Sequence, residues 1–327
     1  MGLLSLIARR VLHAFGLLLA VVLFNFALIH LAPGDPAQVI AGEMGGANPE
    51  ILAQLRAAYH LDRSFAEQLW IYLAQVMQGD LGRSFYFNAP VAALIAQRVP
   101  ATLLLVGTAI LGAVGLGTLL GVTAARRPSG LLSHAITVLS LVGFAAPVFW
   151  TGILLILLFA SVLPIFPVEG MRDVARLGTL GWWGRSLDVA YHLVLPAATL
   201  GLIYLAQYSR LARASMLEVL GADYIRTARA KGLAERIVIF KHALRNAILP
   251  VVTVVGLQFS QIFSGAVLVE TVFAWPGLGR LAYDSILRRD SPTLLGILLF
   301  SGLIVIVVNL LTDLAYRLVD PRIRTGG

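Results

Sequence analysis

Four polar side chains lie within long apolar stretches of this sequence and could contact a polar solute. Gln258, Gln261 and Ser264 recur at i, i+3 and i+6, so one face of a helix would carry all three. Their neutral donors and acceptors suit polar groups without charge. Glu270 follows near the end of the same stretch. It would either pair with Arg280 or a neighbouring loop, or meet a cationic group of a solute.

Sequence features of an enzyme are not visible elsewhere in the chain. Cysteine is absent, which excludes disulfides, thiolate metal sites and a cysteine nucleophile. The two lysines, Lys231 and Lys241, follow Ala230 and Phe240, so there is no phosphate-binding Gly-Lys-Ser/Thr loop. No histidine precedes a glutamate, and the six histidines show no clustered spacing. The sequence therefore predicts no enzyme activity, no metal site and no cofactor bound by this chain.

The composition indicates that the helices carrying these residues lie in lipid. Of the 327 residues, 58% are apolar and 13% are charged, and the mean hydropathy is +0.85. A soluble domain carries about 25% charged residues, so this chain cannot cover itself with polar groups. The expected fold is all-α, a polytopic membrane protein with six transmembrane helices. The six segments are Val11–Leu31, Ala101–Ala125, His134–Leu163, Leu193–Tyr208, Ile248–Phe273 and Thr293–Leu311.

The first of these segments resembles a signal peptide because Arg9 and Arg10 precede it. It is longer than the apolar core of such a peptide, which has about 7–15 residues. The segment APGDP follows it where a small-residue cleavage site would stand. We therefore expect an uncleaved first membrane span.

The net charge of +8 is distributed as membrane insertion favours and does not form one nucleic-acid-binding face. Basic residues gather at the ends of apolar runs, and 15 of the 25 Lys and Arg residues fall in the termini and alternate connecting segments. Such an excess marks the cytoplasmic side, so both termini and segment 209–247 are expected there. Residues 1–100 would form the first helix and a long periplasmic segment, and residues 101–327 the core domain.

Local signals predict smaller features between and within the spans. Ser64 and Glu67 have the spacing of a capping box at the start of a helix. Gly117 and Gly121 form a GxxxG face that permits close helix approach. Two prolines should kink the third and fourth spans: Pro147 and Pro196.

Segment 209–247 is the most informative part of the chain because basic residues alternate there with helix-favouring ones. Asp223 stands at the start of a short predicted helix, where its charge suits the helix dipole. Gly232 would end that helix. The helix would either rest on anionic lipid headgroups or dock in a groove of a partner protein. Composition alone leaves both interpretations open.

The same segment resembles the coupling loop of ABC-importer permeases, whose general pattern is Glu-Ala-Ala, three residues, Gly and then Ile-x-Leu-Pro. Ala228 and Gly232 match this pattern, whereas Arg226 and Thr227 replace Glu and the first Ala, and Pro250 follows later than usual. DYIRTARAKGL and HALRNAILP are instead similar to the dipeptide, oligopeptide and nickel branch. The likeness continues in order through APGDP, GDLGRSF, HLVLPAATLGL, VETVFAWPGLGRL, RRDSP and DPRIR.

The resemblance implies a type I ABC-importer permease fold in the bacterial inner membrane. It implies four kinds of partner: a homologous second permease subunit, two cytoplasmic ATPase subunits that use ATP and Mg, a periplasmic solute-binding protein, and the lipid bilayer. The substrate would be a di- or oligopeptide, or else nickel, glutathione or another small solute of the same family. The residues implied in coupling to the ATPase are Asp223, Tyr224, Arg226, Thr227, Ala228, Arg229, Ala230, Lys231 and Gly232.

Two alternatives lie outside this family. A secondary transporter driven by ions predicts an inverted repeat and paired buried charges near the membrane midplane, and neither pattern is visible. A membrane-embedded hydrolase needs a nucleophile and a base, and no such pair can be identified in the sequence.

Overall fold

Helices form almost all of the regular structure in the computed structural model of this chain. The structure describes residues 3–31, 37–38, 48–58, 62–84, 86–176 and 178–319, although some side chains in these ranges, including those of 256–265 and 311–319, are not described. In these ranges the one β contact is an isolated bridge between Arg83 and Pro90. The expected all-α class is therefore confirmed for the described part of the chain.

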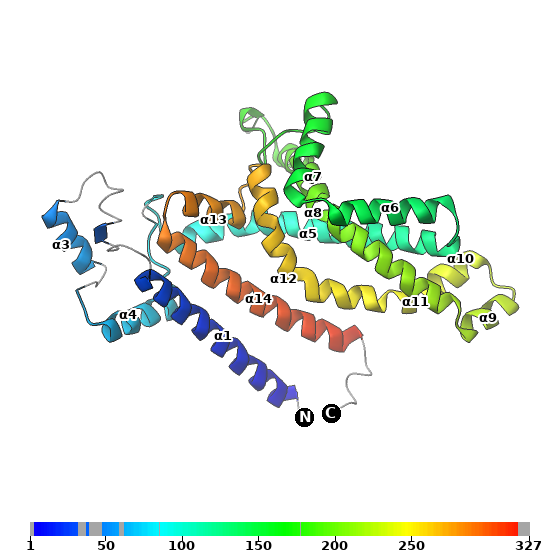
Figure 1. The fold of residues 1–327 in the computed structure, drawn as a ribbon, viewed down its shortest axis with the longest axis horizontal. Helices are drawn as coiled ribbons and strands as arrows, with labels where there is room; N and C mark the ends of the chain where they lie inside the picture. Colours follow the sequence, from blue (N-terminus) through cyan, green and yellow to red (C-terminus); the bar gives the residue numbers. More distant parts are fainter. Residues whose placement is uncertain are drawn as a thin grey trace. The chain divides into compact units, whose positions relative to one another are not determined.

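Figure 1 shows the helices in their order along the chain. The elements that precede α8 are α1 (Leu3–Leu31), α3 (Pro49–Ala58), α4 (Phe65–Met77), α5 (Val91–Arg126), α6 (Leu131–Ala145), α7 (Val148–Ile156), the π-helix η1 (Leu157–Val162) and the 3₁₀-helix η2 (Val174–Arg176). The remaining elements are α8 (Trp182–Leu220), α9 (Asp223–Ala230), α10 (Glu235–Ile237), the π-helix η3 (Val238–Ala243), α11 (Leu244–Ala247), α12 (Leu249–Val272), α13 (Leu278–Leu287) and α14 (Ser291–Val319).

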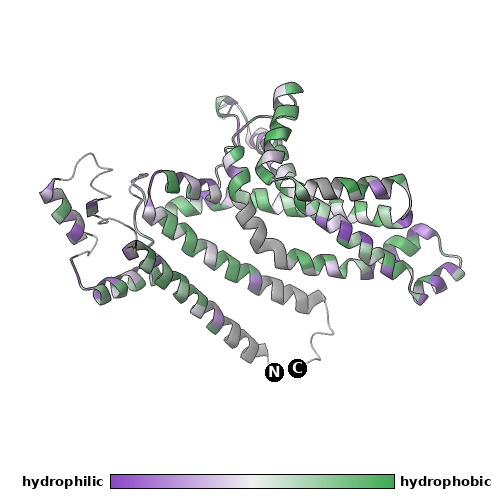
Figure 2. Ribbon diagram, viewed as in Figure 1, coloured by the Kyte–Doolittle hydropathy of each residue, from purple (hydrophilic) through white to green (hydrophobic). Residues whose placement is uncertain are grey.

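The chain divides into two compact units. One contains residues 1–98, 282–310 and 321–327, and the other contains residues 99–281 and 311–320. The expected division into residues 1–100 and 101–327 stays a prediction. Figure 2 shows hydrophilic residues on α3, α9 and α10, whereas the long helices are mostly hydrophobic.

Helix α8 is the centre of the larger unit and packs against α6, α7 and α12. Helix α5 approaches α8 through the predicted GxxxG face. A Cβ atom added at Gly121 would lie 2.5 Å from the Ser209 carbonyl oxygen, and one at Gly117 would lie 3.0 Å from that of Leu205. A Cβ atom would overlap the α8 backbone at Gly121 and would fit only tightly at Gly117, so the prediction of close helix packing is confirmed.

The smaller unit is held together by polar contacts at the ends of its helices. Asn25 Nδ2 of α1 donates to the Leu295 carbonyl oxygen of α14 at 3.0 Å. Ser84 Oγ and Thr293 Oγ1 both donate to Asp290 Oδ2, at 2.5 and 2.6 Å. Asp290 directly precedes α14, where a carboxylate satisfies free N–H groups. The loop before α5 is thus attached to the start of α14.

Three helices in the described part are long and apolar enough to cross a membrane: Val91–Arg126, Trp182–Leu220 and Ser291–Leu310. The number rises to four if Glu235–Ala247 and Leu249–Val255, bent by 44°, are one span. The chain is therefore an all-helical membrane protein.

Two expected spans differ from the structure. The fourth was expected over Leu193–Tyr208, but α8 extends from Trp182 to Leu220, because hydropathy detects only the apolar middle of a helix with polar ends. The helix also continues through Pro196. The third expected span is broken, as α6 ends at Ala145 and Pro147 precedes α7. Proline has no N–H to continue the helical hydrogen bonds.

Candidate functional site

Helix α9 is the short element expected in the basic segment 209–247. It spans Asp223–Ala230, and Asp223 occupies its first turn, where the helix dipole favours negative charge. Thr227 Oγ1 donates to the main-chain oxygen of Asp223 at 3.0 Å. The short helix predicted between Asp223 and Gly232 is therefore present.

The end of α9 is fixed by a glycine. Gly232 has a φ of +74°, a left-handed conformation that residues with a Cβ adopt at a cost. Its N–H donates to the Arg229 carbonyl oxygen at 2.9 Å, and the Leu233 N–H donates to that of Ala228 at 3.4 Å. These two bonds form a Schellman motif. The expectation that Gly232 stops the helix is confirmed.

One face of α9 is buried against its own chain. Ile225 and Ala228 are both buried. They pack in one apolar cluster with Val122, Ala125, Met216, Val238, Ile239, Ala243 and Ala247. The cluster joins α9 to the ends of α5 and α8, so α9 rests on a fixed base.

This packing changes the expected set of partner-contacting residues. Ala228, one of the residues implied in coupling to the ATPase, is buried against its own chain, and its part in coupling stays a prediction. Ile225 was not among the expected residues, although it carries the inward face. Its position three residues before Ala228, on the same side of a helix, is the sequence signal that could have identified it.

The opposite face of α9 is open to solvent. Tyr224, Arg226, Thr227, Ala230 and Lys231 are all exposed. The Tyr224 hydroxyl accepts a hydrogen bond of 2.8 Å from Asn246 Nδ2, which links α9 to α11. The exposed face therefore has a defined orientation relative to the helices behind it.

An ion pair fixes the chain that leaves α9. Arg229 donates to both carboxylate oxygens of Glu235, at 2.8 Å from Nη2 and 3.2 Å from Nε. The hydrogen bond from Arg229 lowers the pKa of Glu235, and the same bond raises the pKa of Arg229. The bidentate geometry suits a guanidinium group. The pair closes the turn around Gly232.

The other charges of α9 are held less firmly. Arg226 and Asp223 lie 3.4 Å apart, and both side chains are highly exposed, so water and salt screen their attraction. Lys231 is exposed and has no ion-pair partner among the described residues. Arg226 and Lys231 are therefore available to an acidic surface.

The second candidate region is α12, which carries the four polar residues of the apolar stretch. Gln258, Gln261 and Ser264 fall in the part of α12 whose side chains lie outside those described. Their place in a solute pathway stays a prediction.

Glu270, near the end of α12, is fully buried. Its Oε1 accepts a hydrogen bond of 2.6 Å from Thr102 Oγ1. Its Oε2 accepts one of 3.1 Å from the main-chain N–H of Arg280. Thr102 Oγ1 in turn accepts a bond of 2.8 Å from the Leu278 N–H. Glu270 and Thr102 thus bind free N–H groups in the first turn of α13, as a helix N-terminus requires.

The turn between α12 and α13 is closed around these groups. Trp275 is fully buried, and its Nε1 donates to the Ala101 carbonyl oxygen at 2.8 Å. A Cβ atom at Gly277 would lie 2.1 Å from Glu270 Oε1, so only glycine fits there. Of the two interpretations of Glu270, these contacts favour a structural partner in the loop. Contact between Glu270 and a solute stays a prediction without a visible route.

No group of three or more potential metal ligands among His, Asp and Glu occurs in the described part of the chain.

Comparison with known proteins gives the family. The model of the "Binding-protein-dependent transport system inner membrane component" matches residues 117–325, and the model of its N-terminal region matches residues 3–106. The chain belongs to this permease family.

Curated relatives resemble the permease along almost its whole length. The dipeptide transport system permease protein DppB of Escherichia coli K12 is 43% identical over 98% of this chain and 99% of its own. The di/tripeptide permease protein DppB of Pseudomonas aeruginosa is 42% identical over 98% and 99%. A putative peptide transport permease of Brucella abortus is 40% identical over the same shares.

A solved structure supports the fold of the permease. The MetNI methionine ABC transporter, in an inward-facing conformation, matches with a TM-score of 0.54 at 16% identity, covering 69% of this chain and 96% of that chain. At this identity the likeness concerns the fold alone. The permease is a non-catalytic, multi-pass component of the inner membrane, and its transport system depends on a binding protein.

Proposed function

We propose that this permease carries di- and oligopeptides across the inner membrane as part of an ATP-driven importer. The relatives from Escherichia coli and Pseudomonas aeruginosa, named for dipeptide and di/tripeptide transport, support this substrate class because they align from end to end. The transport test below distinguishes this substrate class from nickel, glutathione and other small solutes. No described residue favours them.

The two-sided packing of α9 carries the proposal that this helix couples the permease to an ATPase. Ile225 and Ala228 fix one face to the ends of α5 and α8, while Tyr224, Ala230 and Lys231 project from the other. A force applied to the exposed face is transmitted to two long helices because the base is close-packed. A loose basic helix on lipid headgroups would not need this base.

The membrane arrangement proposed is a type I importer fold with six spans. These are α1, α5, α6 with α7, α8, α12 and α14, with both termini in the cytoplasm. The positive charge of segment 209–247 supports this orientation. The complete importer would contain a homologous second permease, two ATPase subunits that hydrolyse ATP with Mg, and a periplasmic binding protein. Closure of the ATPases would bias the permease between two conformations.

Uptake by the reconstituted importer tests both parts of the proposal. The importer is placed in proteoliposomes with its binding protein, and ATP-dependent accumulation of a labelled dipeptide is measured. In the coupling arm, Ala230→Glu adds bulk and negative charge to the exposed face of α9. We expect a loss of uptake of about tenfold or more, which corresponds to about 1.4 kcal/mol of docking free energy.

The matched control is Ala214→Glu, the same substitution at an exposed position of α8, which should leave uptake and ATPase binding unchanged. Wild-type uptake by Ala230→Glu would argue against coupling through α9. Accumulation of nickel or glutathione in place of a dipeptide would overturn the substrate class.

A further inference from the structure

Helix α4, which lies outside the spans described above, is amphipathic: Glu67, Gln68 and Gln75 lie on one side of it, and its other side chains are apolar. Its 13 residues, Phe65–Met77, contain one charged side chain, that of Glu67. Glu67 belongs to the capping box at the start of the helix, where its Oε2 accepts a hydrogen bond of 3.0 Å from the Ser64 N–H. The apolar side chains that point away from this polar side need a covering.

One side of α4 is covered by α1. The Phe65 and Tyr72 rings lie 5.0 and 6.0 Å from the ring of Phe26. Gln68 Oε1 and His30 Nε2 lie 2.9 Å apart. These contacts involve the last two turns of α1, which ends at Leu31. Helix α4 is therefore attached to one end of α1.

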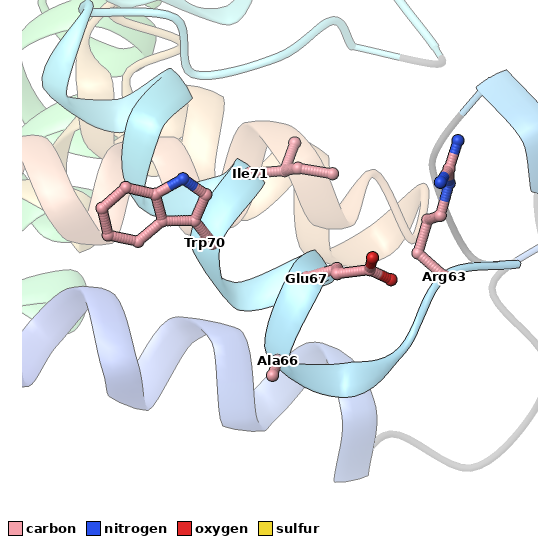
Figure 3. Close-up of a pocket in the computed structure, with 5 residues that line it drawn as sticks. All are labelled: Arg63, Ala66, Glu67, Trp70 and Ile71. Carbon is pink, nitrogen blue, oxygen red and sulfur yellow. The ribbon is translucent and has the colours of Figure 1, made fainter.

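The other side of α4 has no covering among the described residues. Trp70 and Met77, two turns apart, are 69% and 73% exposed. A shallow pocket of about 390 Å³ lies on this side, lined by Arg63, Ala66, Glu67, Trp70 and Ile71. Figure 3 shows Arg63 and Glu67 near the start of the helix, with the apolar Trp70 and Ile71 further along. The charged groups thus lie at one end of an apolar surface.

The position of α4 indicates what covers this surface. Helix α1 contains the apolar stretch Phe15–Leu28, and its side chains Phe24 and Leu28 are exposed near the end that carries α4. In a membrane protein such exposed apolar residues face lipid. Helix α4 contacts α1 at Phe26 and His30, next to the end of this apolar stretch. Tryptophan is enriched at the membrane–water interface because its ring is apolar and its N–H is polar.

We propose that α4 lies in the boundary between headgroups and acyl chains, with Trp70 and Met77 inserted into the lipid. In the topology proposed above, this is the outer surface of the inner membrane. The helix then anchors the end of α1 and the loop that leads to α5. The partner is the phospholipid bilayer itself and not another protein chain.

Site-directed spin labelling tests this placement, because the chain has no cysteine and each introduced cysteine is therefore unique. Nitroxide labels at Trp70→Cys and Ala66→Cys are examined in nanodiscs of phosphatidylethanolamine and phosphatidylglycerol, in the isolated permease and in the full importer. Collision rates with oxygen, which is enriched in lipid, are compared with those of a water-soluble nickel chelate. Leu23→Cys on α1 is the bilayer control, and Glu50→Cys on α3 is the aqueous control.

We expect the Trp70 label to favour oxygen over the nickel chelate in both samples, at a depth shallower than Leu23. Access to nickel equal to that of Glu50 would place α4 in water and overturn the proposal. Protection from both reagents in the full importer alone would show a protein partner and overturn it as well. If the label disturbs the helix, the test uses tryptophan fluorescence instead. Brominated lipid should quench the wild type more than Trp70→Phe if the Trp70 ring lies in the lipid. No quenching of Trp70 would count against insertion.

Discussion

Thr102 and Glu270 are 168 positions apart in the chain, yet the Thr102 hydroxyl donates a hydrogen bond of 2.6 Å to the Glu270 carboxylate. Each group also accepts an N–H from the start of α13, Leu278 to Thr102 and Arg280 to Glu270. A buried carboxylate is stable only when such donors compensate its lost hydration. The contact joins α5, α12 and α13 within one unit.

Thr102→Val should therefore destabilise the permease. The substitution keeps the side-chain shape but leaves the Leu278 N–H and one Glu270 oxygen without this partner, at a cost of about 1–3 kcal/mol. The measurement is thermal or denaturant unfolding in detergent. Thr108→Val on the same helix is the control, because among the described residues Thr108 donates to carbonyl oxygens of its own helix, those of Leu104 and Leu105. Equal stability of the two variants would contradict the role of Thr102.

The contact between α5 and α8 makes a second prediction. Gly121→Ala places a methyl group 2.5 Å from the Ser209 carbonyl oxygen and 2.7 Å from the Ala212 Cβ. The helices must separate, which costs about 1–3 kcal/mol. Gly115→Ala on the same helix meets nothing within 4 Å and should not lower the unfolding midpoint, because alanine favours the helix more than glycine does. A tolerated Gly121→Ala would show that this interface is not close-packed in the folded permease.

Gly232 allows backbone conformation to be tested separately from steric fit. A Cβ atom there meets nothing within 4 Å, but the residue has a φ of +74°. Gly232→Ala should cost about 1–2 kcal/mol through the left-handed conformation alone. Gly232→Asn should cost less because asparagine adopts this conformation more readily. Hydrogen exchange of the α9 amides measures the effect, and equal exchange in the two variants would show that φ is not the cause.

The features predicted from sequence are those whose signal is local. Gly232 and the Ser64 capping box are identified by neighbours within a few positions, and the Gly121 face by helical spacing alone. The partner of Glu270 could not be predicted, because Thr102 lies far away in the chain and only tertiary packing brings the two together. The burial of Ala228 could not be predicted for a similar reason, because the apolar residues that cover it come from four other elements.

The ends of α8 show a second limit of sequence reasoning. Hydropathy follows lipid exposure, and it therefore detected only the middle of a 39-residue helix. The polar residues from Ser209 onward continue the same helix, because helix formation depends on backbone hydrogen bonds and not on apolarity. Helix α9 follows α8 after two residues, Gly221 and Ala222, and the cytoplasmic place of segment 209–247 stays a prediction.

The Arg229–Glu235 pair should make the end of α9 sensitive to acid. Because the pKa of Glu235 is lowered by the hydrogen bond from Arg229, the folded state favours the ionised carboxylate. Its stabilising effect is therefore present above the pKa of an unfolded glutamate and is lost as the pH falls through the lowered pKa. The ¹³C chemical shift of the Glu235 carboxyl, followed from pH 7 downward in nanodiscs, reports the titration directly. In Arg229→Gln the midpoint should rise toward the ordinary glutamate value, whereas in Arg226→Gln, which removes a different arginine of α9, it should stay low. A midpoint unaffected by Arg229→Gln would mean that Arg229 does not hold the turn after α9.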